Sequence, residues 1–496
     1  MTTPREGEIQ GETLWGGRFA SPLHPAIRAF TTSLPFDRRL VRHDLIGSLA
    51  HVRMLMEREI LDREAARVIL EGLSGMLWEV EEGGLRVEGE DEDVHSWIER
   101  TLCERVGPAG GGLHTARSRN DQTGTALRLY LREALRDVVL RILALEEVWL
   151  ARADEHRESW MPGYSHLQRG QPVSLAHHLL AHVWALLADG RRLRAAHGSA
   201  GLSPLGAGAL AGTSHPIDAA RSAALLGFDA MYPNAQLAVA DRDYVAEAVF
   251  ACALVMVHLS RWAEEVVLWA TAEFGFLSLE DAVAQGSSLM PQKRNPEAAE
   301  ILRGKCGRVA GDLATLLVVM KGLPLSYDSD LQEDKEALFD ALDTAAGSLR
   351  AAAVLAGGIR YRTDRLAAAL HEGHLTATEL ADHLVGRGVP FRTAHEQAGR
   401  AVREAEGRGA ELWELSREAL RASCPEAGDD VLEVLSPEAS ARARRSPGGP
   451  APERVEEQLA AARKAAEELG SWAEGLEPPP IYRAHQEGRL LEQEVS

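Results

Sequence analysis

Apolar residues recur at helical spacing through much of the chain. The longest regular run has spacings of 4, 4, 3, 4, 3 and 4 residues, and it comprises Leu127, Leu131, Leu135, Val138, Ile142, Leu145 and Trp149. Such spacing places all seven side chains on one face of a helix. A second run, between Ile301 and Met320, has the same character. The pattern predicts long helices whose apolar faces need partner helices. Several stripes of this length exceed what one chain's bundle should cover, so we expect other subunits to cover part of them.

Proline and glycine mark where these helices can extend and where they must end. No proline lies between Pro172 and Pro204 or between Pro233 and Pro291, which leaves room for helices of ~30 residues. We predict an all-α chain with three mainly helical domains and a central bundle of long helices. The predicted division is a disordered leader (1–13), an N-terminal helical domain (14–112), the central bundle (113–365), a C-terminal helical domain (366–474) and an unstructured tail (475–496).

Composition narrows the range of functions. The 496 residues include 5% aromatic residues and carry a formal net charge of −20, which argues against a nucleic-acid partner. No uninterrupted apolar run approaches the ~20 residues of a membrane span, and the polar N-terminus has no signal-peptide core. The four cysteines are scattered without metal-ligand spacing. We therefore expect a cytoplasmic protein without a membrane partner.

The segment Gly286–Pro296, with the sequence GSSLMPQKRNP, concentrates residues suited to anion binding. Two serines supply hydroxyls, Lys293 supplies a positive charge, and Pro291 prevents a continuous helix. Asn295 and Pro296 are typical of a helix N-cap followed by the first turn. An anion would then lie at the positive end of a helix. The alternative interpretation is a surface loop that precedes a helix.

Other polar segments interrupt the helical pattern. Arg117–Asp121 (RSRND) precedes the long apolar run and reads either as a helix cap or as an anion site. Gly163–Pro172 (GYSHLQRGQP) reads as a loop with one histidine, and Gly322–Glu336 separates two helices. Four of the five lysines lie between 293 and 335, in a chain that otherwise uses arginine.

These motifs together resemble the fumarase/aspartase superfamily, whose signature is GSSxMPxKxN. Gln292 before Lys293 is similar to the argininosuccinate lyase family, as are RSRND, GYSHLQ and the C-terminal segments Ala377–His395 and Gly448–Val455. The resemblance covers roughly residues 14–470. It implies an elimination that converts the small molecule argininosuccinate into arginine and fumarate, a step of arginine biosynthesis. It implies no metal and no organic cofactor.

The resemblance also implies roles for individual residues. Ser287 would be the base, and Lys293 would hold the aci-carboxylate that forms when a proton leaves carbon beside a carboxylate. His166 would serve the acid side of the reaction, paired with Glu300. The implied substrate-binding residues are Ser33, Ser118, Arg119, Asn120, Ser165, Asn295, Tyr327, Gln332 and Lys335. For His95 and Glu99, a structural role and a catalytic role stay open.

The chain departs from the family pattern at several positions. Asp328 and Ser329 replace a usual Asn and Arg, and Leu237 and Ala240 replace two polar residues. These departures leave open a related carbon–nitrogen lyase acting on another N-succinyl amine. A non-catalytic structural protein on the same scaffold is the second alternative. The resemblance also implies a homotetramer in which each active site is shared between subunits and assembled from three chains, and we expect the same arrangement here.

Overall fold

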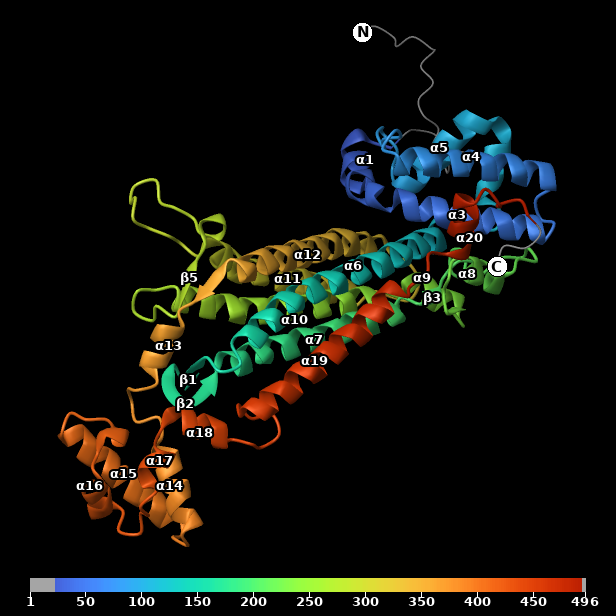
Figure 1. The fold of residues 1–496 in the computed structure, drawn as a ribbon. Coiled ribbons are helices and arrows are strands. Elements are labelled where there is room, and N and C mark those ends of the chain that lie inside the picture. Colours follow the sequence, from blue (N-terminus) through green and yellow to red (C-terminus); the bar gives the residue numbers. More distant parts are fainter. Residues whose placement is uncertain (1–22, 493–496) are drawn as a thin grey trace.

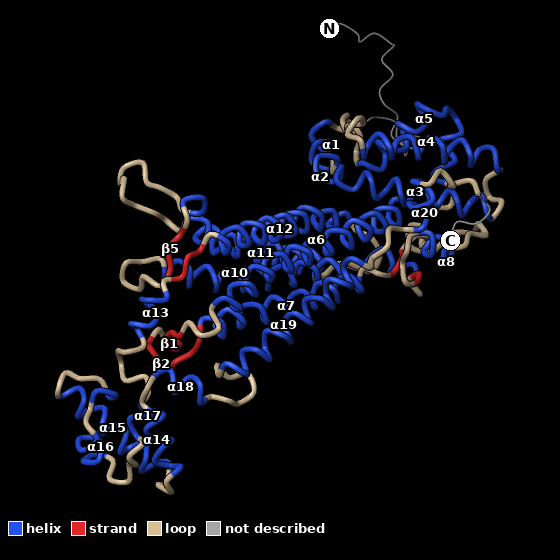
Figure 2. Tube along the Cα trace, in the orientation of Figure 1, coloured by secondary structure: helices blue, strands red, loops and turns tan. Residues whose placement is uncertain are grey.

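The computed structural model describes residues 23–492 of the protein. The predicted leader (1–13) and the first residues of the predicted N-terminal domain lie outside this range. Helices dominate, and strands are short pieces near the two ends of the long helices (Figure 2). The prediction of a mainly helical, multi-domain fold is confirmed.

Five long helices run along one another and form the central bundle (Figure 1). They are α6 (Arg119–Glu155), α7 (Leu175–Ser199), α10 (Asp243–Trp269), α11 (Glu297–Met320) and α12 (Asp334–Gly357). Successive helices run in opposite directions, so each polar segment that connects two of them lies at one end of the bundle or the other. We call these ends the α1 end, where α6 begins, and the hairpin end, where α6 ends.

The predicted apolar stripe on α6 is buried inside the chain itself. Leu127, Leu131, Leu135, Ile142 and Leu145 are completely buried, because α7, α12, α19 and α3 all pack against α6. We expected this stripe to need cover from other subunits, and that reasoning was wrong. The stripe stabilises the single chain and carries no information about assembly.

Helix α11 is covered on one narrow stripe only. Leu302, Val309 and Leu316 are buried at seven-residue spacing, whereas Leu317 and Val318 are 53% and 71% exposed. Its neighbour α10 is apolar and long enough to cross a membrane by length and composition, but 56% of the relevant window is buried against other helices. The uncovered apolar surface of this bundle therefore lies on α11 rather than on α6.

The α1 end carries a cap of shorter helices. Its elements are α1 (Pro25–Thr31), α2 (Leu34–Asp37), α3 (Val41–Glu57), α4 (Arg63–Glu81), α5 (Val94–Val106), β3 (Leu202–Ser203), α8 (Ala219–Leu225), β4 (Ala230–Met231), α9 (Ala235–Ala240) and α20 (Pro480–Gln486). β3 and β4 pair in parallel. α20 returns from the C-terminal part of the chain and contacts α3 and α8. Ile481 is completely buried there, so the prediction of an unstructured tail was wrong for this segment.

The hairpin end carries two antiparallel strand pairs. β1 (Trp160–Ser165) pairs with β2 (Gln168–Ser174), and β5 (Leu277–Leu279) pairs with β6 (Ile359–Tyr361). The segment that was predicted as a loop around His166 is thus a β-hairpin. Its turn contains no glycine, so the usual turn signal is missing from the sequence.

The remaining helices follow β6 and extend beyond the hairpin end. They are α13 (Thr363–Ala369), α14 (Ala377–Gly386), α15 (Phe391–Gly407), α16 (Arg417–Ser423), α17 (Val431–Val434), α18 (Pro437–Ala443) and α19 (Pro452–Glu474). α14 to α17 share a separate apolar core between Leu380 and Leu435. α19 instead turns back along α6 and α7 (Figure 1). The separate core is therefore smaller than the predicted domain 366–474.

Candidate active site

The start of α6 organises the α1 end. Ser118 is the N-cap, and Asp121 completes a capping box by accepting from the Ser118 N–H at 2.9 Å. The other oxygen of Asp121 accepts from the N–H groups of Gly206 and Gly208 at 3.0 and 2.8 Å. Burial raises the pKa of Asp121 to about 6, against the opposing effect of these N–H donors and Arg117. One buried carboxylate thus joins the predicted RSRND motif to the glycine-rich connection after α7.

Glycine is required at the two tethered positions. Gly206 and Gly208 have φ of 105° and 60°, and a Cβ atom on Gly208 would lie 2.7 Å from the Gly212 carbonyl oxygen. Asn120 adds a second tether, because its side-chain amide donates to the Ala209 carbonyl at 3.0 Å. The amide hydrogens of Asn120 are therefore partly used inside the chain.

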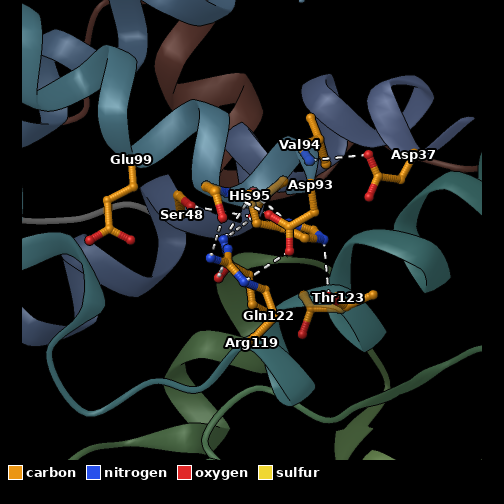
Figure 3. Close-up of polar contacts among 12 residues, drawn as sticks. Asp37, Ser48, Asp93, Val94, His95, Glu99, Arg119, Gln122 and Thr123 are labelled. Atoms are coloured by element: carbon orange, nitrogen blue, oxygen red, sulfur yellow. Dashed lines mark hydrogen bonds and ion pairs between the residues drawn. The ribbon is translucent and has the colours of Figure 1, made fainter. Parts of the chain in front are cut away.

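A buried polar network surrounds the side chains of the first turn of α6 (Figure 3). Asp44 on α3 lies 2.9 Å from Nδ1 of His95 and accepts from the Gln122 amide. Thr123 contacts the other ring nitrogen of His95 at 3.0 Å. Burial alone would raise the pKa of Asp44, but His95 and the neighbouring groups outweigh it and lower the pKa to about 2. The network fixes His95 between α3, α5 and α6, which favours the structural interpretation of this histidine.

Arg119 lies at the edge of the same network. Its guanidinium is 3.2 Å from the Asp93 carboxylate and donates to the Ser96 hydroxyl at 3.0 Å. Figure 3 shows Arg119 beside Asp93 and Gln122, with Glu99 set apart from them. Glu99 is largely buried, and burial raises its pKa. The cationic side chain is held in place before any ligand arrives.

Lys335 belongs to a second buried group at the α1 end. Its ammonium donates to Asp334 at 3.0 Å, and Asp334 also accepts from the guanidinium of Arg242 at the start of α10. All three side chains are at most 2% exposed. Burial would lower the pKa of Arg242, but Asp334 outweighs this and raises it. Two cations share one carboxylate, so the group keeps a net positive charge.

Three further predicted contacts also lie at this end. Tyr327 is half-buried against Ala207 and Ala238, and burial raises its pKa to about 12. Gln332, in the turn before α12, is half-buried. Ser33 is only 1% exposed and donates its hydroxyl to Asp37 at 2.5 Å. Ser33 and Lys335, each 1% exposed, are thus the predicted substrate contacts that the single chain presents least.

His166 occupies the tip of the β1–β2 hairpin. Ser165 pairs with Gln168, so His166 and Leu167 form a two-residue turn. Both have positive φ, 55° and 56°, as a type I′ turn requires. Such values are uncommon for residues with a Cβ atom, and they concentrate at functional sites. Leu167 is 69% exposed, and the turn projects Ser165 and His166 into solvent.

The segment Gly286–Pro296 is a closed loop beyond β5. The backbones of Gln285 and Asn295 bond to each other twice, at 3.0 and 2.7 Å, and close the neck of the loop. Inside it, the Ser287 hydroxyl oxygen accepts from the N–H groups of Leu289 and Met290 at 3.3 and 3.1 Å. These donors stabilise negative charge on that oxygen. Two backbone N–H groups of the loop are therefore directed at the oxygen that is predicted to act as the base.

Asn295 does not cap the following helix. The N-cap of α11 is Pro296, without a side-chain bond, so the prediction of an Asn295 cap was wrong by one residue. The cause is the strand-like pairing of Asn295 with Gln285, which holds its backbone outside the helix. Its side-chain amide makes no hydrogen bond with residues 23–492 and is free to bind a ligand.

The predicted residues fall into two groups at opposite ends of the bundle. Ser33, Ser118, Arg119, Asn120, Tyr327, Gln332 and Lys335 lie at the α1 end, and Ser165, His166, Ser287, Lys293, Asn295 and Glu300 lie at the hairpin end. α6 has 37 residues and spans ~55 Å between these ends. The group at the hairpin end is more exposed: within the described range, the side chains of His166, Lys293 and Glu300 bond to no other residue.

The positions that depart from the family pattern lie at the α1 end. Leu237 on α9 is 45% exposed, and Ser329 begins the turn before α12. Asp44 and Asp334 were not among the predicted site residues. Each contacts a residue that was considered for the site: Asp44 contacts His95, and Asp334 contacts Lys335. The signal available for Asp334 was its place next to Lys335. Asp44 had no comparable local signal, because α3 carries several other charged residues and the partner His95 is 51 residues away.

Comparisons with known proteins show which family this chain resembles in sequence and in fold. A family profile described as "Lyase" matches residues 17–311, and one described as "Argininosuccinate lyase C-terminal" matches residues 374–442. The argininosuccinate lyase of Desulforudis audaxviator is 49% identical over 457 residues, covering 92% of this chain and 99% of that protein. The argininosuccinate lyase of Symbiobacterium thermophilum is 48% identical, covering 90% and 97%.

Among solved structures, EDDS lyase in complex with formate has a TM-score of 0.81 and 29% identity, covering 93% of this chain and 92% of that one. The long-helix bundle, the loop carrying Ser287 and the hairpin carrying His166 thus occur in a chain that matches its relatives over nearly their whole length. On this sequence and structural evidence, the chain belongs to the argininosuccinate lyase family of the fumarase/aspartase superfamily.

Proposed function

We propose that this protein is a carbon–nitrogen lyase that splits argininosuccinate into arginine and fumarate. The observation that carries the proposal is the near full-length identity of 48–49% to argininosuccinate lyases, with every predicted catalytic side chain present. A cytoplasmic location belongs to the same proposal, and the four free cysteines are compatible with it.

The reaction requires a proton to leave carbon while the adjacent C–N bond breaks. Ser287 removes the proton, with its oxygen held by the N–H groups of Leu289 and Met290. The electron pair forms the double bond of fumarate through a doubly charged aci-carboxylate. Lys293, on the same loop, and the amide of Asn295 stabilise that charge. His166 donates a proton to the departing nitrogen, which leaves as part of arginine. Glu300 would partner His166 from another chain, because the two side chains make no bond within residues 23–492.

We propose that the active protein is a homotetramer in which each site is assembled from three chains. One chain supplies its α1 end, and the hairpin ends of two others supply His166 and Ser287. The two groups of residues are separated by the ~55 Å length of α6, so one chain does not complete a site. Antiparallel packing of a second chain would bring its hairpin end to the α1 end of the first. The exposed apolar residues of α11, among them Ile301, Leu317 and Val318, supply a surface for this packing.

The charges of the two ends suit this combination. The α1 end holds Arg119, beside Asp93, and the buried Arg242–Asp334–Lys335 group, in which two cations share one carboxylate; these are the cations available to a dicarboxylate at this end. The hairpin end contributes the base and the acid. Binding groups and reacting groups thus come from different parts of the chain.

One observation favours a second substrate. Leu237, Ala240, Asp328 and Ser329 all depart from the family pattern, and all lie at the α1 end, where the binding groups gather. A lyase that releases fumarate from another N-succinyl amine is therefore the second candidate.

The test is the appearance of fumarate in ultraviolet absorbance, with argininosuccinate and a panel of N-succinyl amines as substrates. The proposal expects the highest kcat/KM with argininosuccinate. A higher kcat/KM with another amine would select the second candidate, and no fumarate from any substrate would leave a structural protein as the explanation. Size-exclusion chromatography with light scattering tests the tetramer separately.

A further inference from the structure

A cluster of metal-ligating side chains lies outside the residues assigned to the reaction. His178 and His182 are on α7, four residues apart, so their rings share one face of the helix. Glu265 is on α10, which packs against α7. The cluster lies near the hairpin end, because α7 begins directly after β2 and α10 ends at Trp269.

The three side chains already converge on one point. Nε2 of His178 and Nε2 of His182 each lie 2.8 Å from the same carboxylate oxygen of Glu265. Together they are the one group of three or more His, Cys, Asp and Glu side chains in residues 23–492 whose ligand atoms all lie within 4.8 Å of one another. Their exposed fractions are 23%, 14% and 35%, so an ion could enter from solvent.

The donor set matches a known preference of divalent metals. Two imidazole nitrogens and one carboxylate oxygen, with water as a fourth ligand, are a recurrent zinc environment. Two histidines at i and i+4 on one helix are a recurrent way to supply the nitrogens. With metal–ligand distances of ~2.1 Å, tetrahedral donors lie ~3.4 Å apart. The nitrogen–oxygen distances therefore need to widen by only ~0.6 Å, which a small rotation of the Glu265 side chain provides.

The protonation states also permit binding. A metal replaces the proton on Nε2, and the proton must then reside on Nδ1. Nδ1 of neighbouring His177 is buried without a partner, whereas those of His178 and His182 are not among the buried unsatisfied atoms of the described chain. Water can therefore accept from both Nδ1–H groups.

The surroundings are rigid and aromatic. The ring of His178 lies 4.9 Å from that of Trp269, and the ring of His182 lies 5.6 Å from that of Trp149. Both tryptophans are at most 6% exposed. Rotation of either histidine is limited by these contacts, so the ligands are held near their binding geometry without an ion. A bound ion would also be close enough to report through tryptophan fluorescence.

We propose that His178, His182 and Glu265 form a structural binding site for a divalent transition-metal ion, with zinc as the preferred metal. The ion links α7 to α10 at the base of the hairpin that carries His166. It takes no part in the elimination, which uses the loop and hairpin residues described above. The site was missed from the sequence because Glu265 lies 83 residues after His182; the signal available was the spacing in His-Leu-Leu-Ala-His.

The test is zinc titration of the untagged full-length protein after chelator treatment, in competition with a chromophoric chelator. The expected result is one zinc per chain for the wild type and at least ~100-fold weaker binding for His182→Asn and Glu265→Gln, since each loses a ligand. Glu264→Gln is the matched control, because its carboxylate pairs with Arg303 and it changes the net charge equally. This control should bind zinc as the wild type does.

Copper quenching of tryptophan fluorescence gives a second readout, and it should be strong in the wild type and in Glu264→Gln only. Two results would overturn the proposal. One is a wild type that binds less than one zinc per chain, which can be read even if a variant fails to fold. The other is a folded Glu265→Gln protein whose zinc affinity equals that of Glu264→Gln.

Discussion

Replacing Asp121 by Asn should loosen the glycine-rich connection at the α1 end. The carboxylate accepts three backbone N–H groups, one on Oδ1 and two on Oδ2. An amide has a single oxygen, so in its better orientation it serves Gly206 and Gly208 while its NH2 group faces the Ser118 N–H. One charge-assisted bond is lost, and the other two become neutral bonds.

The size of the effect follows from these three bonds. A hydrogen bond to a charged group contributes ~1.5–3 kcal/mol and a neutral one ~1 kcal/mol, so the change costs about 3–5 kcal/mol in local stability. Amide hydrogen exchange measures this directly, because ~1.4 kcal/mol corresponds to a tenfold change in rate. We expect the amides of Gly206 and Gly208 to exchange at least ~100-fold faster in Asp121→Asn than in the wild type.

The matched control is Asp137→Asn on the same helix. Asp137 is 52% exposed and pairs with Arg141 one turn away, an interaction of ~0.3–0.5 kcal/mol. It should leave exchange at Gly206 and Gly208 unchanged. Wild-type exchange rates at both glycines in a folded Asp121→Asn protein would refute the idea that this carboxylate anchors the connection.

Four further outcomes are expected. Ser287→Ala should stay folded by circular dichroism and lose at least ~100-fold in kcat, whereas Ser288→Ala should keep most activity; near-normal turnover in Ser287→Ala would remove that residue as the base. Mixing inactive His166→Asn and Ser287→Ala under subunit exchange should restore activity at about a quarter of sites if the two residues come from different chains, and no recovery would contradict the shared site. The 286–296 loop should gain exchange protection when fumarate and arginine bind, and equal protection in both states would argue against a lid. Asp44→Asn should lower the free energy of unfolding at neutral pH, because folding lowers the pKa of Asp44 and so stabilises its ionised form. The wild type should lose this contribution as the pH falls from about 4 to about 2, whereas the variant should not. The same acid unfolding in both proteins would contradict this.

Much of the helical core could be predicted from the sequence, because periodicity is a local property. The α6 stripe was predicted residue by residue, and a helix cap was one of the two interpretations of Arg117–Asp121, where Ser118 is the N-cap. The full cover on that stripe could not be predicted, since part of it comes from α12 and α19, which lie far along the chain. The need for other subunits was therefore inferred from the wrong helix.

The site was predicted as a set of residues but not as an arrangement. The hairpin around His166 was missed because its turn places His and Leu at positive φ, where sequence rules expect glycine or asparagine. The Asn295 cap was misplaced because pairing with Gln285 is a contact between the two ends of a loop. Asp44 was missed because its partner His95 is 51 residues away. Each miss involves a non-local contact or an unusual backbone conformation.

The docking of α20 on the α1 end has a consequence for the order in which the protein matures. The Ser74 hydroxyl bonds to His485, 411 residues later, the Trp78 ring lies 4.7 Å from that histidine, and Tyr482 donates to Glu81. At 5–20 residues per second, a ribosome makes α20 on the order of 20–80 s after α4. Throughout that interval the face of α4 that receives α20 is complete in sequence but uncovered, and it is open to chaperones. Quality control that recognises this face would distinguish nascent and prematurely terminated chains from finished ones.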